Sequence, residues 1–120
     1  MDLDRFKEVN DRFGHLEGNR VLRRVAQGLK AACRTGDLVA RMGGDEFVLV
    51  LRDFPQGAVE RRKRELCDMA IAAGREVCGE AIVSLSAGHA TFPNDGADAE
   101  KLLAAADRKM YQNKLLHHAD

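Results

Sequence analysis

The sequence Leu38-Val39-Ala40-Arg41-Met42-Gly43-Gly44-Asp45-Glu46-Phe47-Val48-Leu49-Val50-Leu51 places two adjacent glycines between two apolar runs. The runs over 38–41 and 46–51 have the length and composition of short strands. Gly43 and Gly44 permit the positive φ angles of a tight turn and the close approach of a ligand to the backbone. The pattern predicts a β-hairpin with two carboxylates, Asp45 and Glu46, at the exit of its turn. An ordinary exposed turn is the alternative, because glycines and acids are common in turns.

Helical periodicity on either side of this hairpin predicts a mixed α/β domain. The expected elements are helices over about 5–13, 19–33 and 58–74, a loop over 14–19, a strand over 81–88, and a last helix that Asp98 caps. The sequence has no internal linker and no repeat, so we expect residues 1–120 to form one domain.

Composition and charge argue against several classes of protein. The 19 basic and 19 acidic residues cancel, which disfavours a nucleic-acid binder with a basic face. No apolar run approaches the ~18 residues of a membrane span, and no signal-peptide pattern opens the chain. Three irregularly spaced cysteines, Cys33, Cys67 and Cys78, indicate buried thiols of a reducing compartment rather than a disulfide framework or a zinc site. We therefore expect a cytoplasmic protein, or the cytoplasmic part of a longer, membrane-anchored one.

Asp2 and Asp4 form a second group of candidate ligands. An acid pair at the end of a strand, just before a helix, suits a hard divalent cation, and Mg²⁺ usually takes one or two carboxylates plus substrate phosphates. The helix that begins near Arg5 offers N–H groups to an anion, and Lys7 adds a positive charge. A solvated chain terminus is the alternative that these residues leave open.

Asn10 and Asn19 form a third group. Their amide side chains have both donors and acceptors, so they could recognise the edge of a base. For Asn19, capping of the following helix is the alternative.

Together these motifs resemble the GGDEF family of diguanylate cyclases, over essentially the whole chain. The resembling segments, in the family's order, are Asp2 to Asp11, Gly14-His15 with Gly18, Arg41 to Phe47, Ser86-Ala87-Gly88, and Ala106-Asp107 with Met110-Tyr111 and Lys114. The resemblance implies an α/β (α+β) fold with a mixed, mainly antiparallel sheet flanked by helices, similar to the nucleotidyl cyclase and polymerase palm fold.

The resemblance also implies an activity: condensation of two GTP molecules into cyclic di-GMP and two pyrophosphates, across a two-fold homodimer. Two Mg²⁺ ions, with Mn²⁺ as a substitute, would be held by Asp2, the Leu3 carbonyl, Asp45 and Glu46. Asp45 and Glu46 would be catalytic, with Glu46 assisting the metal or taking the 3′-hydroxyl proton. The implied substrate-binding residues are Arg5, Phe6, Lys7 and Lys114 at the phosphates, Asn10 and Asn19 at guanine, and Gly43 and Gly44 in the turn.

Three departures from the family pattern leave a second function open. The family usually has aspartate where this chain has Asn19; a carboxylate accepts from both guanine donors, whereas an amide oxygen and its NH₂ leave one donor mismatched, at a cost of roughly 1–3 kcal/mol. The family's G-R-N segment after Lys114 has no match, and neither do its opening helix and most of its first strand. The alternative is a degenerate module that binds cyclic di-GMP or GTP for regulation without turnover.

Arg34 and Asp37 form an R-x-x-D motif whose distance from Gly43 resembles that of the family's inhibitory site for the product. The arginine could clamp a phosphate or a guanine edge, and a surface ion pair is the alternative. The resemblance implies feedback inhibition by cyclic di-GMP, and a sensor or receiver domain as the source of the input signal in a longer chain.

Overall fold

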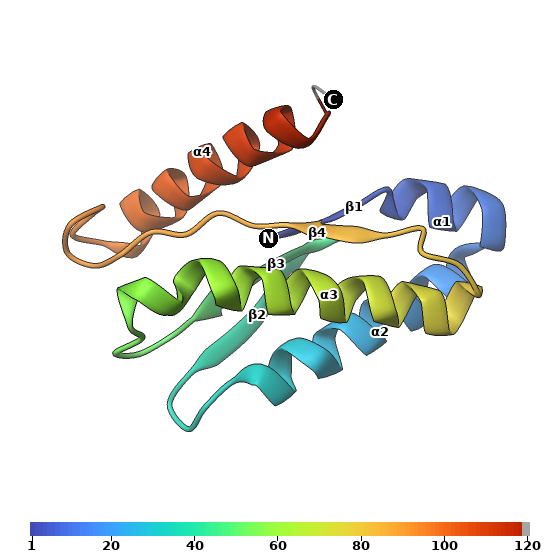
Figure 1. Cartoon of the computed structure of the whole chain (residues 1–120), viewed down its shortest axis with the longest axis horizontal. Helices are drawn as coiled ribbons and strands as arrows, with labels where there is room; N and C mark the ends of the chain where they lie inside the picture. Colours follow the sequence, from blue (N-terminus) through green and yellow to red (C-terminus); the bar gives the residue numbers. More distant parts are fainter. Residues whose placement is uncertain (119–120) are drawn as a thin grey trace. The chain divides into compact units, whose positions relative to one another are not determined.

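The computed structural model describes residues 1–118, and the side chains of residues 1–115 (Figure 1). Its elements are β1 (Asp2–Asp4), α1 (Phe6–Phe13), α2 (His15–Ala32), β2 (Leu38–Gly43), β3 (Glu46–Val50), the short 3₁₀ helix η1 (Gln56–Ala58), α3 (Val59–Cys78), β4 (Ser84–Ser86) and α4 (Ala99–His118). The chain divides into two compact units, Asp2–Leu85 and the part from Ser86 onward with Met1. Each unit is described by itself.

The sheet has the strand order β2-β3-β1-β4. Strands β2 and β3 form the predicted antiparallel hairpin, in register from Leu38 opposite Val50 to Arg41 opposite Phe47, with a bulge just before Gly43. Strand β1 is antiparallel to β3 on its other side. The α+β class and the antiparallel pairing predicted from the sequence are therefore confirmed.

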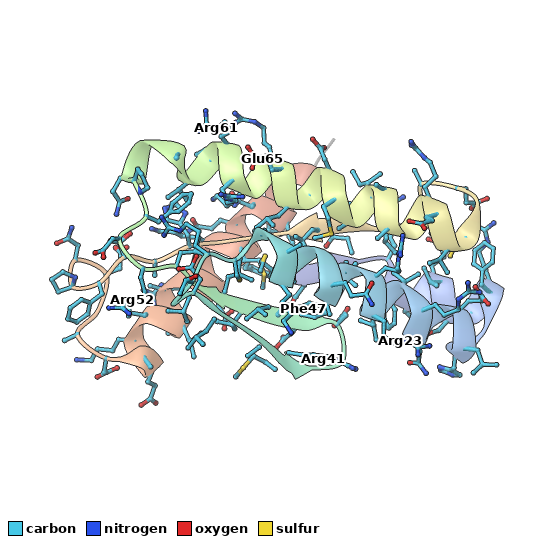
Figure 2. All side chains as sticks on the ribbon, turned by 90° about the horizontal axis from the view of Figure 1, so that it is seen from below. Arg23, Arg41, Phe47, Arg52, Arg61 and Glu65 are labelled. Carbon is cyan, nitrogen blue, oxygen red and sulfur yellow. The ribbon has the colours of Figure 1, made fainter. Side chains whose placement is uncertain are left out.

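Helices α2 and α3 run side by side in both views of the molecule (Figures 1 and 2). The predicted apolar stripe of α2 is buried, with Val21, Val25 and Leu29 fully enclosed, and Phe47 from β3 is 1% exposed. Val9 of α1 and Leu3 of β1 are buried as well. This core holds β1, α1 and the hairpin in place, and those are the elements that bear the predicted site residues.

The structure corrects three predicted boundaries. The loop expected over 14–19 is wrong, because α2 begins at His15 and only Gly14, at φ 89°, separates it from α1. Helix α3 continues to Cys78 and ends where Gly79 adopts φ 81°. The strand expected over 81–88 is reduced to Ser84–Ser86, beside a β1 that itself has three residues.

In the unit from Ser86 onward, Gly88 lies tightly against α4. A methyl group at Gly88 would overlap the Ala106 carbonyl and the Met110 amide nitrogen, so close packing on the helix explains the glycine of the Ser86-Ala87-Gly88 motif. Asn113 Nδ2 donates to the Ala87 carbonyl at 2.9 Å. The predicted helix cap is confirmed, because the Lys101 amide donates to Asp98 Oδ1 at 2.9 Å.

Two further expectations concern membranes and thiols. Within the described residues, none of the helices has the length and apolar character of a membrane span.

The three cysteines are free, as expected, but they are half-buried rather than buried. Burial and the nearby Glu17 and Glu80 carboxylates raise the pKa of the Cys78 thiol above its ordinary value, which disfavours a reactive thiolate there.

Candidate active site

Strand pairing brings the predicted acidic residues to one end of the hairpin. Asp2 of β1 is the Cα partner of Glu46 of β3, and the Leu3 amide donates to the Asp45 carbonyl at 3.1 Å. Residues directly opposite each other in antiparallel strands project their side chains to the same face. One carboxylate oxygen of Asp2 is buried, while Glu46 is exposed. The structure therefore places Asp2, Leu3, Asp45 and Glu46 together.

Asp4 has a different environment from Asp2. Its Oδ2 accepts a hydrogen bond from Ser84 Oγ of β4 at 3.1 Å in a partly buried position. This contact ties Asp4 to the neighbouring strand. The alternative that Asp2 and Asp4 belong to a solvated terminus is wrong for both, since both are half-buried within the sheet.

The donor set is made of oxygen atoms. Among the side chains of residues 1–115, no group of three or more His, Cys, Asp and Glu is arranged to hold a metal ion by itself. Three carboxylates and a carbonyl are oxygen donors of the kind that Mg²⁺ takes, and this ion usually completes its coordination with substrate phosphates and water. The residues present thus fit an ion that binds together with a phosphorylated substrate.

The hairpin turn is open to solvent. Gly43 and Gly44 have φ angles of 152° and 47°, and an added methyl group at either would meet no atom within 4 Å. Backbone conformation, not packing, therefore accounts for these glycines. Arg41 Nε donates to the Gly44 carbonyl at 2.8 Å, which braces the turn from the preceding strand.

The start of α1 presents backbone N–H groups next to the acids. Arg5 occupies the N-cap position in the left-handed conformation, at φ 63°, and no side chain caps the helix. The first intrahelical bond is donated by Val9 to the Arg5 carbonyl, so the amides before it have no partner within the helix. Arg5 and Lys7 are exposed and Phe6 is half-buried. This arrangement suits an anion.

The two predicted amides come from different helices, Asn10 from α1 and Asn19 from α2. A methyl group at Gly18 would overlap Oδ1 of Asn10 and approach the Phe6 ring to 3.3 Å, so the Asn10 side chain lies over Gly18, the neighbour of Asn19. Asn19 is the fifth residue of α2, whose N-cap is Gly14. The helix-capping alternative for Asn19 is therefore wrong.

Asn19 also lines a cavity of about 460 Å³ between α2 and β2, with Leu22, Arg23, Ala26 and Arg41. Figure 2 labels Arg23 on α2 and Arg41 on the hairpin. The sequence motifs gave no functional role to the four other lining residues. Their helical spacing from Asn19 could have indicated that Leu22, Arg23 and Ala26 share its face.

Arg34 and Asp37 form a clasp with Arg52. Asp37 Oδ2 accepts from the Arg34 amide at 2.9 Å and from its Nε at 3.2 Å, while Oδ1 accepts from the Arg52 amide at 2.9 Å. These hydrogen bonds hold the pKa of Asp37 below its usual value, and the one from the Arg52 amide contributes most. The predicted alternative, an ion pair between the two residues, is present in the structure, with the Asp37 side chain covered and that of Arg34 half exposed.

The Arg34 guanidinium has further partners around this clasp. Its Nη2 donates to the Arg52 carbonyl, and its Cζ lies 5.5 Å from the centre of the Phe54 ring. Arg62 of α3 lies over the same ring at 5.5 Å. Lys114 lies on α4, in the unit from Ser86 onward, and its part in phosphate binding stays a prediction.

Comparison with known proteins gives consistent matches over nearly the whole chain. Residues 1–119 match the family described as "Diguanylate cyclase, GGDEF domain". The chain is 38% identical over 113 residues to diguanylate cyclase TpbB of Pseudomonas aeruginosa, an alignment covering 92% of this chain and 26% of TpbB. It therefore spans about a quarter of that relative.

Two solved structures are similar in fold as well as in sequence. A sensory box/GGDEF family protein from Caulobacter crescentus superposes with a TM-score of 0.77 at 38% identity, over 94% of this chain and 74% of that one. A microbial GGDEF domain described in a novel interaction mode with cyclic di-GMP gives a TM-score of 0.77 at 34% identity, over 95% and 69% of the two chains.

Proposed function

The chain belongs to the GGDEF family of diguanylate cyclases, and from this premise we propose that it forms the GTP site of an enzyme that condenses two GTP molecules into cyclic di-GMP and two pyrophosphates. The observation that supports this most directly is the β1–β3 register, which sets Asp2 opposite Glu46 beside the open Gly43-Gly44 turn. Nucleotide chemistry needs carboxylates, a phosphate site and a base site, and in this proposal residues 2–46 would supply all three.

The triphosphate would lie at the start of α1. The first-turn amides after Arg5 point out of the helix, and the exposed cations of Arg5 and Lys7 add positive charge. Phe6 contributes a backbone amide at the same place.

Asp2, the Leu3 carbonyl, Asp45 and Glu46 would hold two Mg²⁺ ions, or Mn²⁺ in their place. Bound there, the ions neutralise phosphate charge and stabilise the charge that develops at the leaving group. Glu46 is the exposed carboxylate of the set and would orient the 3′-hydroxyl or accept its proton. Gly43 and Gly44 leave the backbone of the turn open to the substrate.

The base would lie beside the first turns of α2, where Asn10 of α1 lies over Gly18 and Asn19 is the next residue. One chain offers one such site, and the product contains two guanylate units. Catalysis therefore requires a second copy of the chain, with the 3′-hydroxyl of each bound GTP facing the α-phosphate of the other.

We further propose that product binds at Arg34 and Asp37. Since Asp37 already accepts three hydrogen bonds within the clasp, it would shape the site, and Arg34 would supply the donors to cyclic di-GMP. Calorimetry with cyclic di-GMP on the parent and on Arg34→Ala tests this. Equal affinities would restrict the motif to its structural role.

A degenerate module that binds GTP or cyclic di-GMP without turnover is the second candidate. Asn19 favours it, because an amide satisfies guanine less well than a carboxylate does. Incubation of the chain with GTP and Mg²⁺, followed by chromatography, separates the two candidates. Cyclic di-GMP in the reaction supports the enzyme, while nucleotide binding without product supports the module.

A further inference from the structure

The cavity between α2 and β2 has an apolar floor and a polar rim. Leu22, 5% exposed, and the half-buried Ala26 form the floor, while Asn19, Arg23 and Arg41 form the rim. Its volume of about 460 Å³ is in the range of small-molecule sites. All five residues belong to the Asp2–Leu85 unit.

The arginines around this cavity differ in what already holds them. Arg41 Nε is bound to the Gly44 carbonyl. On α2, Arg20 pairs with Glu17 at 3.2 Å, and Arg24 pairs with Glu76 of α3. In the described part of the chain, the Arg23 side chain makes no hydrogen bond or ion pair. Its guanidinium is therefore available to a ligand in the cavity.

The residues that line the cavity include two cations and an amide, and no carboxylate. Such a lining favours a ligand edge made of acceptors. Guanine has one, O6 and N7, which an arginine fork matches with two hydrogen bonds, whereas adenine places an amino donor at the corresponding position. Asn19 and Arg23 are one helical turn apart, roughly 5–6 Å between Cβ atoms, so they could contact adjoining parts of one base.

We propose that Arg23 is a specificity-determining residue, which donates to O6 and N7 of the guanine whose donor edge faces Asn19. This inference rests on the proposed function, since it takes GTP as the ligand. It explains how a chain with asparagine at position 19 can select guanine. Asn19 contacts the donor edge of the base less well than a carboxylate would, and Arg23 adds hydrogen bonds at the acceptor edge.

The test is calorimetry with GTP, 7-deaza-GTP and ATP, with Ca²⁺ in place of Mg²⁺ to limit turnover. 7-Deaza-GTP lacks the N7 acceptor and keeps the triphosphate and the donor edge. The variants are Arg23→Ala, Arg23→Lys, which keeps the charge but loses the fork, and Arg24→Ala. Arg24 is the matched control, because it lines only the neighbouring α2–α3 cavity, whereas Arg23 lines both cavities.

The parent should bind GTP more tightly than 7-deaza-GTP, and Arg23→Ala should bind the two equally. The preference for GTP over ATP should fall roughly 5- to 150-fold in Arg23→Ala, the range for one bidentate base contact. Arg23→Lys should lose most of the same preference, and Arg24→Ala should retain it.

Two results overturn the inference while leaving the proposed function in place. Equal weakening of GTP and ATP in Arg23→Ala would assign Arg23 to the phosphates, and an unchanged ratio of GTP to 7-deaza-GTP affinity would remove it from the base. Failure of the parent to bind any of the three nucleotides would overturn the proposed function and this inference together.

Discussion

Asp2 lies directly opposite Glu46 in the antiparallel β1–β3 pair, and the next residue of β1, Leu3, is bonded through its amide to the carbonyl of Asp45. The backbone of two strands thus sets the spacing of the acids. The ladder between β1 and β3 does not use the Asp2 or Glu46 carboxylates, so replacing either leaves the hydrogen bonds of the ladder in place. This separation of scaffold and chemistry makes the proposed site testable by substitution.

Asp2→Ala should remove the dependence of GTP binding on a divalent cation. GTP affinity of the parent should fall when Ca²⁺ is replaced by a chelator, because the phosphates then meet the acids without a cation between them. In Asp2→Ala, the GTP affinity measured with Ca²⁺ and that measured with the chelator should agree. Asp4→Asn is the control, since it keeps an acceptor for Ser84 and should respond to chelation as the parent does. Equal responses in Asp2→Ala and the parent would count against this metal site.

Gly18→Ala should weaken GTP binding with little change in stability. The new methyl group displaces the Asn10 side chain, which is the movable end of its contact with Gly18, and alanine is the better helix former by about 1 kcal/mol. We expect the free energy of unfolding to change by less than about 1 kcal/mol, and the variant to bind GTP as weakly as Asn10→Ala. Gly57→Ala, where the methyl group meets nothing within 4 Å, is the control. Parent-like affinity in Gly18→Ala would show that Asn10 does not contact the base.

Asn19→Asp should tighten GTP binding by up to ~2 kcal/mol, the scale of one unsatisfied polar contact. The carboxylate can accept from both donors of guanine, and Arg23 one turn further along α2 offsets its charge. The measurement is the GTP dissociation constant of both forms with Ca²⁺ in place of Mg²⁺. Unchanged or weaker binding in the variant would show that position 19 does not recognise the base.

Asp37→Asn should destabilise the fold at neutral pH, by an amount that shrinks in acid. The pKa of Asp37 lies below its ordinary value of 3.8, chiefly because of the Arg52 and Arg34 amides. The unfolded chain therefore takes up the proton first, and the stabilisation by Asp37 is complete above that value and lost as pH falls through the lower folded-state pKa.

The measurement for this prediction is urea unfolding of the parent and Asp37→Asn between neutral pH and about pH 3, around the ordinary value of an aspartate. Asp95 also has a lowered pKa, through the Thr91 amide, but it is present in both proteins and cancels in the difference. A difference that stays constant across this range would contradict the clasp as the cause.

The hairpin, the helical stripe of α2 and the cap at Asp98 were predictable, because each depends on residues close together in the sequence. The role of Gly18 was not, since the contact that excludes a side chain there comes from Asn10 on the preceding helix. The sequence alone does not distinguish the partners of Arg20, Arg23 and Arg24, which lie on the same helix. Only the fold reveals that Glu76 of α3 holds Arg24 and that Arg23 faces the cavity.

The R-x-x-D motif shows the same limit of local reasoning. Its spacing indicates a pair of opposite charges, and the structure confirms that Arg34 and Asp37 interact. The partner that the motif does not reveal is Arg52, fifteen residues further along the chain. Its amide donates to Asp37 Oδ1 and gives the motif a structural role.

In the proposed function, the β1–β3 acids form the turnover site of a diguanylate cyclase. The direct measurement is the rate of cyclic di-GMP formation from GTP and Mg²⁺ by the parent and by Glu46→Gln, with both proteins verified as folded by their thermal unfolding curves. We expect product from the parent and none detectable from Glu46→Gln, at parent-like stability, because an exposed carboxylate at the start of β3 contributes little to the core. Equal rates in the two proteins, or no product from the parent, would contradict it.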